Sequence, residues 1–359
     1  MPGHLLIHNN VNVIGIELRI FGMCRRLLAL ACLTTVLAGD LTLAGTVSTL
    51  QEIEANGGIT LDSAGDIYAA NYGPLNDSSG SRFVWKLSPT GAFDPVIFAS
   101  DINIASGNDF DSQDNLFQSN FGGNVISKID QSGVVTTFSS EVLGPIGITI
   151  DDADNLFVAN CHRNDLSRID ANGVATIFAT SPLFTCPNGM TRDENGDLYV
   201  INWNDGQIFR VTITGNVSTF ASVPQPGGHV TIAGDRLYAT SFGHHRVFEF
   251  ELRGANAGAQ LATIGTGTQG STGGSYTQAS FNRPNGITAD ASGQVLYVTD
   301  ATGVRKIELE DEAPAPPPPP PPPPPTSTPS GGGGGSFGWE LLLYAPFLMW
   351  RRFRRRRVS

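Results

Sequence analysis

GITLDSAGDIYAANY (residues 58–72) is the first of six related segments, and these segments decide the fold. The other five begin at residues 108, 147, 189, 230 and 286, and they read NDFDSQDNLFQSNF, GITIDDADNLFVANC, GMTRDENGDLYVINW, VTIAGDRLYATSF and GITADASGQVLYVTD. Each contains two short runs rich in β-branched and aromatic residues around a turn of Asp, Asn or Gly, which is typical of paired strands. A repeat of about 40 residues with four strands is the pattern of a β-propeller blade.

The ends of the repeat array predict how the ring closes. Four copies are followed by a matching outer strand, at residues 94–100, 134–140, 174–180 and 216–222. The sixth copy stops after its third strand, at 303–309, and a segment of the missing kind, TVSTLQE, stands at 46–52. We therefore expect an all-β fold: a six-bladed β-propeller of four-stranded blades over residues 45–312. The N-terminal strand would complete the last blade and remove its open edge.

Both ends of the chain differ from the repeats and predict separate segments. Residues 1–44 have the order of a signal peptide, with Arg25 and Arg26 before an apolar run and small residues before a cleavage point; Met23 is an alternative start of translation. Residues 313–336 form a Pro- and Gly-rich linker whose ten consecutive prolines predict a stiff spacer. Residues 337–359 join a short hydrophobic segment to a cluster of arginines, and the segment is shorter than the ~20 residues that a stable membrane span needs.

The C-terminal order of features predicts an address. A glycine run (331–335), a short apolar stretch and an arginine cluster resemble, in this order, the GlyGly-CTERM sorting signals of Gram-negative bacteria. The resemblance implies cleavage near the glycines and delivery to the cell surface; the alternative is a plain, weak membrane anchor. We expect a protein that is exported through the inner membrane and is then displayed or secreted, with membrane contact only through this segment.

The charge of the core restricts its partners. Residues 45–336 contain 30 acidic and 13 basic side chains, a net charge of −17 that the arginines of the tail conceal in the whole-chain value. So acidic a protein repels phosphate backbones, which argues against nucleic acid as a partner. The remaining candidates are an unidentified small molecule or a protein of the envelope or the extracellular space, and we expect a monomer.

Two cysteines remain once the N-terminal segment is set aside. Cys161 ends the second strand of the third repeat and Cys186 precedes the fourth, so a propeller would bring them to one face in neighbouring blades. Export to an oxidising compartment would favour a disulfide between them, and the alternative is two free buried thiols.

The last repeat carries a family resemblance. FNRPNGITADASGQVLYVTDATGVRKIEL (281–309) resembles an NHL-repeat blade, and residues 45–309 are similar to the NHL and regucalcin/gluconolactonase group of six-bladed propellers. This architecture carries lactonases, lyases and binding modules, so the resemblance implies a fold more strongly than an activity.

The resemblance also implies a metal site. The lactonases of the group hold a divalent cation at the tunnel mouth with an acid of the first blade, an Asn of a Pro-Asn-Gly loop and an Asp of a later loop, beside an Asn-Asp pair. Here Asn188 and Asn285 lie in Pro-Asn-Gly loops, and Asn108-Asp109 stands where the pair is expected. The chain departs from the pattern at Asn56, where the acid would be, and at Asn285, where the later Asp would be.

Ring geometry would collect these residues at one end of the tunnel. Oxygen ligands suit Ca²⁺, so Asn108, Asn188 and Asn285 are candidate metal ligands, and Asp109 and His229 are candidates for moving a proton. A second set comes from the loops that leave the second strands: Asn71, Asn120, Asn160, Asn202, Ser241 and Asp300. For the four Asn residues of this set the structural alternative is that they satisfy exposed backbone groups where strands end. Residues 265–274 are low in complexity and predict a flexible flap.

Two functions follow from these features, and a structural protein of the envelope is a third alternative. The first is a displayed or secreted propeller that binds a ligand or protein partner at the tunnel mouth without catalysis, which the missing first-blade acid and the display-type tail favour. The second is a calcium-dependent hydrolase of the gluconolactonase type, in which the cation would polarise a lactone carbonyl and activate water.

Overall fold

The computed structural model describes residues 45–74 and 82–309, and these form an all-β propeller of six blades. The described ranges contain 25 strands and no helix. None of their segments is therefore a helix that is long and apolar enough to cross a membrane. The predicted signal peptide, the predicted linker and the C-terminal segment with its arginines lie outside the described residues.

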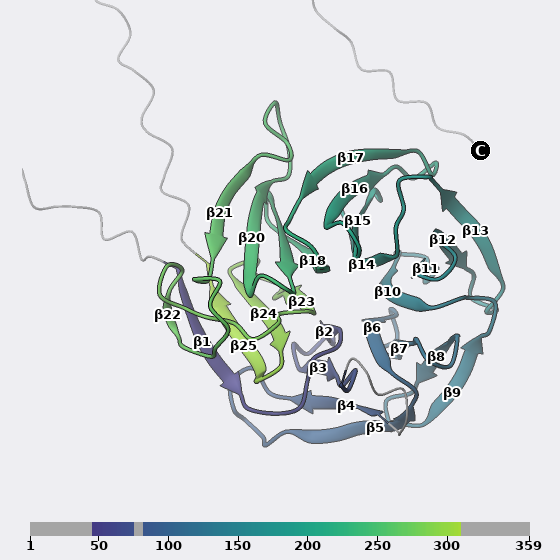
Figure 1. The fold of residues 1–359 in the computed structure, drawn as a ribbon. Helices are drawn as coiled ribbons and strands as arrows, with labels where there is room; N and C mark the ends of the chain where they lie inside the picture. The colour runs from purple at the N-terminus through teal and green to yellow at the C-terminus, as the bar shows by residue number, and fades with distance from the viewer. Residues whose placement is uncertain (1–44, 75–81, 310–359) are drawn as a thin grey trace, which may run out of the picture. The chain divides into compact units, whose positions relative to one another are not determined.

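Each blade is an antiparallel sheet whose first strand lies nearest the central axis (Figure 1). The first three blades are ordered outward from the axis as β2 (Ile59–Leu61), β3 (Ile67–Ala70), β4 (Arg82–Leu87) and β5 (Val96–Ile102); β6 (Ala105–Phe110), β7 (Leu116–Asn120), β8 (Val125–Ile129) and β9 (Val135–Ser139); and β10 (Pro145–Ile150), β11 (Leu156–Asn160), β12 (Asp165–Ile169) and β13 (Ala175–Thr180). The next two are β14 (Pro187–Arg192), β15 (Leu198–Asn202), β16 (Gln207–Val211) and β17 (Val217–Ser222); and β18 (Gly227–Ala233), β19 (Arg236–Ser241), β20 (Arg246–Glu251) and β21 (Gln260–Ile264).

The sixth blade confirms the predicted closure. Its strands β23 (Ile287–Ala289), β24 (Val295–Asp300) and β25 (Gly303–Glu308) come from the end of the repeat array, and β1 (Thr46–Gln51) from its start. Strand β1 pairs antiparallel with β25, with Thr46 opposite Glu308 and Val47 opposite Ile307. In Figure 1 the purple β1 accordingly lies beside the yellow-green β25. A short fifth strand, β22 (Gly274–Ser275), pairs with the outer edge of β1.

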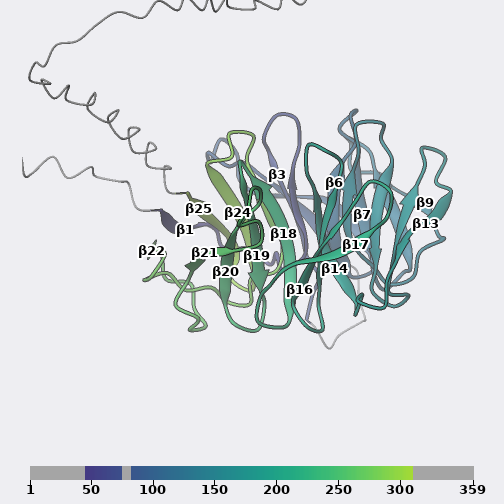
Figure 2. The same cartoon turned by 90° about the horizontal axis from the view of Figure 1, so that it is seen from above.

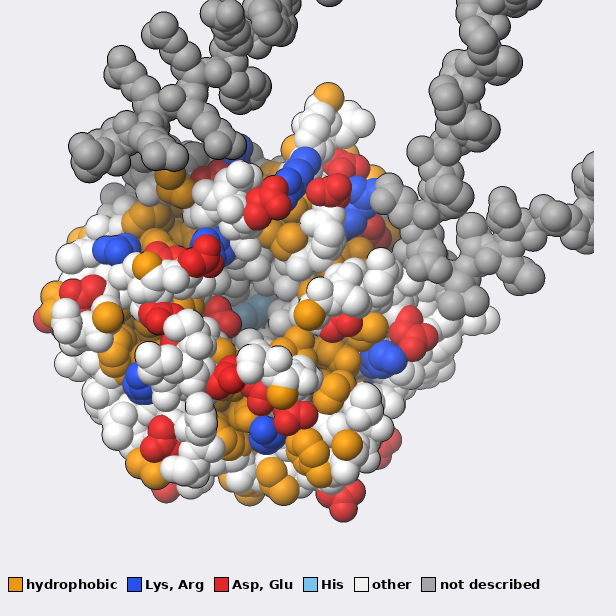
Figure 3. Space-filling model, turned by 180° about the vertical axis from the view of Figure 1, so that it is seen from behind, with side chains coloured by type: hydrophobic (Ala, Val, Ile, Leu, Met, Phe, Trp, Pro, Cys, Tyr) orange, Lys and Arg blue, Asp and Glu red, His pale blue; other side chains and the backbone are white. Residues whose placement is uncertain are grey.

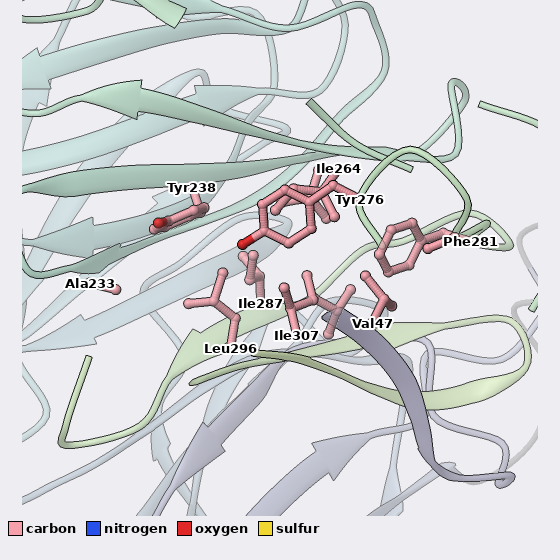
Figure 4. Close-up of a cluster of buried hydrophobic side chains, with 12 residues drawn as sticks. Val47, Ala233, Tyr238, Ile264, Tyr276, Phe281, Ile287, Leu296 and Ile307 are labelled. Carbon is pink, nitrogen blue, oxygen red and sulfur yellow. The ribbon is translucent and has the colours of Figure 1, made fainter. Parts of the chain in front are cut away.

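The hydrophobic core lies between the blades, which stand side by side when the ring is viewed from its edge (Figure 2). Each of six buried clusters joins two neighbouring blades, as when Ile148 and Leu156 of the third blade pack with Phe117 and Ile126 of the second. The alternation of apolar residues in each strand produces this arrangement, because both faces of every inner strand contact a neighbour. Figure 4 shows the cluster at the closure, where Val47 of β1 packs near Ile307, Phe281 and Tyr276.

Residues 265–281, which include the predicted flexible flap, are held in place by hydrogen bonds, and we call them the fastened segment. This corrects the expectation from the composition of residues 265–274. The backbone amides of Gly265, Thr266 and Gly270 donate to the carbonyls of Tyr276, Ala279 and Phe281 at 2.8–3.1 Å. The buried side chain of Arg305 binds the same segment through the carbonyls of Ser280 (2.7 Å) and Thr272 (3.2 Å). A glycine-rich composition gives an isolated chain freedom, but here strand pairing with β1 and a buried cation remove it.

Candidate functional site

A cavity of about 550 Å³ lies at one end of the ring, where loops enter the first strands and leave the second strands. Its wall includes residues from all six blades, and its volume is in the range of small-molecule sites. We call it the mouth cavity. The described residues that line it include no Asp, Glu, Lys or Arg, although the protein as a whole is acidic. An uncharged cavity in so acidic a protein favours an uncharged occupant, because a buried charge without a partner is costly.

Aromatic rings form the wall of the mouth cavity, and we call these five residues the aromatic collar: Tyr72, Phe121, His162, Trp203 and Phe242. The rings form two arcs. Phe121 lies 6.1 Å from Tyr72 and 4.8 Å from His162, measured between ring centroids, and Trp203 lies 5.2 Å from Phe242. Phe121, Trp203 and Phe242 each follow directly on the polar residue that ends the second strand of a blade, and Tyr72 follows Asn71, the residue just after β3.

The aromatic collar is the part of the site that sequence analysis missed. Its signal was present in the repeats as Asn-Tyr, Asn-Phe, Asn-Trp and Ser-Phe pairs at 71–72, 120–121, 202–203 and 241–242. An aromatic residue at a strand end is common in any β protein. Only closure of the ring turns four such positions toward one space.

Asn188 and Asn285 line the mouth cavity, as the metal hypothesis required, and both also brace neighbouring blades. Asn188 Nδ2 donates to Gly227 O and Gly228 O, each at 2.9 Å. Asn285 Nδ2 donates to Asn56 O at 2.7 Å. The oxygen of Asn285 has no hydrogen-bond donor within the described ranges, although the residue is only 9% exposed. A buried acceptor without a donor is unusual in proteins, so this oxygen is a candidate contact for a bound molecule.

Below the mouth cavity the inner strands approach so closely that glycine is needed. A Cβ on Gly58 would lie 2.6 Å from Gly107 Cα, and one on Gly286 would lie 3.0 Å from Gly58 Cα. Five of the six blades carry glycine at this position, and the remaining one, the fifth blade in chain order, carries His229. Beyond this ring of glycines is a separate polar space of about 100 Å³, the inner tunnel. Figure 3 shows one face of the molecule hollowed at its centre, with a histidine side chain deep in the opening.

The structure places Asn108, Asp109 and His229 along the inner tunnel and Asn188 and Asn285 along the mouth cavity. The five candidates therefore divide between two spaces on either side of the ring of glycines. The register explains the division, because Asn108 and Asp109 lie one and two positions beyond Gly107, whereas Asn188 and Asn285 each lie one position before the glycine of their blade.

Asp109 joins three blades. Its Oδ1 accepts from Thr60 Oγ1 of the first blade at 3.4 Å, and its Oδ2 accepts from the backbone amide of Ile150 in the third blade at 3.0 Å. The other five inner strands carry threonine at this position: Thr60, Thr149, Thr191, Thr231 and Thr288. Burial raises the pKa of the Asp109 carboxyl to about 6, and its hydrogen bonds oppose that rise only in part.

His229 is 7% exposed, and its Nε2 has no hydrogen-bond partner among the described residues. Burial lowers the pKa of its imidazole to about 4, so the ring is neutral at pH 7. Asn108 donates weakly to Tyr68 O at 3.4 Å, while its Oδ1 is buried without a partner within the described ranges. The inner tunnel thus holds polar groups but has room for only a few water-sized molecules.

The polar residues that end the second strands serve the fold, in agreement with the structural alternative. Asn160 is fully buried, donates to Asp165 Oδ1 at 2.8 Å and accepts from Leu143 N at 3.1 Å. Asp300 is equally buried and is paired with Arg305 at 3.4 Å. The mouth cavity is lined by none of the six residues of this set, as far as the described ranges show.

Cys161 and Cys186 form a disulfide that joins the third blade to the fourth. Both residues also line the mouth cavity, between the arc that ends at His162 and the arc that begins at Trp203. The disulfide therefore ties together the two arcs of the aromatic collar on one side of the cavity.

The donors at the mouth cavity do not fit the calcium ion that the family resemblance implies. Calcium prefers six to eight oxygen ligands that include carboxylates, and the side-chain oxygens of the described lining are neutral amides and hydroxyls without a carboxylate. Asp109, which directly follows the candidate metal ligand Asn108 in sequence, lines the inner tunnel, and both of its carboxylate oxygens accept hydrogen bonds. Among the described residues no three His, Cys, Asp or Glu side chains converge in a metal-binding group.

Comparison with curated proteins supports the NHL resemblance over part of the chain. An 89-residue segment is 37% identical to NHL repeat-containing protein 2 of Gallus gallus, and the match covers 24% of this chain and 11% of that protein. The chain thus matches only about a ninth of this relative's length. No protein-family model matches the chain.

Solved structures show the same architecture at low sequence identity. An auxiliary nutrient binding protein from Bacteroides thetaiotaomicron superposes with a TM-score of 0.62 at 12% identity, covering 74% of this chain and 77% of the other. A gluconolactonase from Xanthomonas campestris gives 0.56 at 17% identity, over 73% and 89% of the two chains. Virginiamycin B lyase from Staphylococcus aureus gives 0.52 at 16%, over 74% and 99%. The predicted likeness to NHL-type and gluconolactonase-type six-bladed propellers is confirmed as a likeness of fold.

Proposed function

We propose that this protein is an exported binding protein that takes a small uncharged ligand at the mouth of its propeller. The observation that carries the proposal is the mouth cavity itself. It combines a volume of about 550 Å³ with an aromatic collar and with no charged side chain among its described lining residues. Binding sites for small molecules are mostly apolar, with a few polar groups that fix orientation, and Asn188 and Asn285 would supply those groups.

The division of the polar candidates supports binding over hydrolysis. A hydrolase needs its acid or base within hydrogen-bond reach of the bound substrate, directly or through one water. Asp109 and His229 line the inner tunnel, whose volume of about 100 Å³ is small for a lactone. His229 with a pKa of about 4 would also be a weak base at pH 7.

Export is part of the proposal and rests on the sequence of the two ends and on the disulfide. Disulfides persist in oxidising compartments, which agrees with a signal peptide over residues 1–44. The Pro-rich spacer would hold the propeller away from a membrane-associated C-terminal segment until that segment is cleaved. Solved structures with this fold include a nutrient-binding protein and a lyase, so the scaffold is compatible with the binding of a small molecule.

A fluorescent neutral probe tests the proposal. We would titrate N-phenyl-1-naphthylamine into the full-length chain and into Trp203→Ala and Phe121→Ala variants. Loss of either ring should raise the dissociation constant about tenfold, because each removes a large apolar contact. Phe93→Ala, at a 37% exposed position outside the described lining of the mouth cavity, is the control and should bind as the unmodified chain does.

Unchanged binding in both ring variants, or no saturable binding at all, would contradict the proposal. Metal analysis of the same preparation separates it from the calcium-dependent lactonase. The lactonase predicts one calcium ion per chain and hydrolysis of a lactone, both of which the Asn188→Ala variant should lose. That result would show that the function is catalysis and not binding alone.

A further inference from the structure

We infer that the ligand of the mouth cavity is a neutral carbohydrate of two or more rings. The inference rests on the proposed function, because it names the chemical class of the ligand in the same cavity. Three properties of the described residues carry it: the aromatic collar, the oriented amides of Asn188 and Asn285, and a second pocket that continues from the first.

The aromatic collar suits a sugar ring. A pyranose presents C–H groups on its faces and hydroxyls around its edge, so it can stack on an aromatic side chain while its edge stays polar. Trp203 is partly exposed and Phe242 is 8% exposed, and both line the cavity from neighbouring blades. Their centroids are 5.2 Å apart and their planes are inclined by 53°, so the two rings form a bent wall. Aromatic residues give large contact area at a small entropic cost, because only two torsions are fixed.

The amides supply acceptors for hydroxyl groups. Asn188 donates its amide hydrogens to the carbonyls of Gly227 and Gly228, so its planar carboxamide directs Oδ1 away from these carbonyls. Asn285 Nδ2 donates a hydrogen bond to Asn56 O, and the buried Oδ1 of Asn285 lacks a donor within the described ranges. A sugar hydroxyl donates one hydrogen bond and accepts others, and it carries no charge. It would satisfy Asn285 Oδ1 and would be compatible with a cavity whose described lining residues carry no charge.

A second pocket beside the mouth cavity provides room for a ligand of more than one ring. It has a volume of about 380 Å³, is lined by Glu54, Arg283 and Ala301 among others, and shares Asn56 and Phe242 with the mouth cavity. Ala301 follows the second strand of the sixth blade, the position that is aromatic in four other blades. Among the described residues, the sixth blade therefore adds no ring to the aromatic collar on this side. A second sugar unit would pass Ala301 and lie near Glu54 and Arg283, whose charged groups bind hydroxyls well.

A saccharide panel tests the inference on the full-length chain. Neutral mono-, di- and trisaccharides of glucose, galactose, mannose and N-acetylglucosamine would compete with N-phenyl-1-naphthylamine, and the strongest competitor would be titrated by calorimetry. We expect a di- or trisaccharide to bind, Trp203→Ala to weaken it at least tenfold, and Trp203→Phe to retain most of the affinity. Asn285→Ala should also weaken binding, and the melting temperature of each variant shows whether it is folded.

Ala301→Trp tests the path of the second ring. This exposed position should accept the larger side chain without loss of stability. The variant should weaken the di- or trisaccharide at least tenfold and leave binding of the matching monosaccharide within twofold. An equal effect on both, or none on the longer sugar, would overturn the two-ring assignment.

The panel also separates this inference from the function on which it rests. Probe binding that depends on Trp203 but that no saccharide displaces at 50 mM would overturn the carbohydrate assignment and leave the binding site standing. Absence of both probe and saccharide binding would overturn the two together.

Discussion

Asp109 and His229 each stand at a position where the other five blades carry a different residue. Threonine replaces Asp109 in the other blades, and glycine replaces His229. Both side chains line the inner tunnel, where burial disfavours their charged forms. The two pKa shifts make the free energy of unfolding change with pH in opposite directions, because one group is an acid with a raised pKa and the other is a base with a lowered pKa.

Asp109 should make folding less favourable as the pH rises. Its pKa is about 6 in the folded protein and 3.8 without the fold, so its stabilising contribution is complete below pH 3.8 and is lost as the pH rises through 6. Asp109→Thr introduces the residue of the other blades and removes this dependence. The free energy of unfolding of the unmodified chain, relative to the variant, should fall by roughly 1–3 kcal/mol between pH 4 and pH 7. Urea denaturation at four pH values measures it, and parallel profiles would contradict the assignment.

His229 should have the opposite effect. Its pKa is about 4 in the fold and 6.5 outside it, so its contribution is complete above pH 6.5 and is lost as the pH falls toward 4. His229→Gln has no group that titrates in this range. Its free energy of unfolding should therefore fall less on acidification than that of the unmodified chain, by roughly 1–3 kcal/mol between pH 6.5 and pH 4. If His229→Gln is as acid-sensitive as the unmodified chain, the imidazole is not buried in its neutral form.

At the scale of elements, the closing blade depends on one buried cation. Arg305 is fully buried in β25, and it donates to Ser48 O of β1, to Thr272 O and Ser280 O of the fastened segment, and to Asp300 of β24. Its guanidinium also lies 5.2 Å from the centroid of the Phe281 ring. A single side chain thus links β1, β25 and the segment between β21 and β23, the described residues considered.

Arg305→Met should destabilise the propeller by about 3 kcal/mol, because it leaves Asp300 and several carbonyls buried without their partner. Arg253→Met is the matched control. Arg253 pairs with Glu194 at the surface, where the two side chains are 41% and 66% exposed, and solvent screens such pairs so that they add little to stability. Chemical denaturation measures both variants. Equal stability in the two would show that the closure does not depend on Arg305.

Other elements repeat one contact in successive blades. In the first four blades an aromatic residue of the second strand meets a phenylalanine of the outer strand edge to face, as in Tyr68–Phe98 and Phe157–Phe178, with centroids 4.8–4.9 Å apart. Such pairs contribute about 0.5–1.5 kcal/mol beyond the area they bury. Turn aspartates link neighbouring blades on the other side, as when Ser63 Oγ donates to Asp114 at 2.5 Å. The aspartates of the repeat thus act chiefly as structural residues.

At the scale of the whole molecule, the disulfide affects both stability and the site. Replacing Cys161 and Cys186 together by serine should lower the free energy of unfolding by about 3 kcal/mol, the value expected when a link across 25 residues is lost. Because the bond joins the two arcs of the aromatic collar, probe binding should also weaken. Denaturation and probe titration with and without a reducing agent measure both effects. The unmodified chain should change on reduction and the double variant should not.

Local patterns along the chain were enough to predict the number of blades, their strand pattern, the closure by β1 and the pair of cysteines at one face. These follow from local periodicity and from a repeat that leaves one strand missing at one end and one spare at the other. Sequence also identified Asn188 and Asn285 as residues of the tunnel mouth.

Which candidate residues share a space depends on the folded ring and could not be predicted from the chain. Asn108 and Asn188 look alike in sequence, yet they lie on opposite sides of the ring of glycines, because a shift of two positions along an inner strand moves a side chain from the mouth cavity to the inner tunnel. The aromatic collar arose in the same way, from single residues about 40 positions apart that carry no mutual signal along the chain. Convergence around an axis is a property of the closed ring, and no local pattern encodes it.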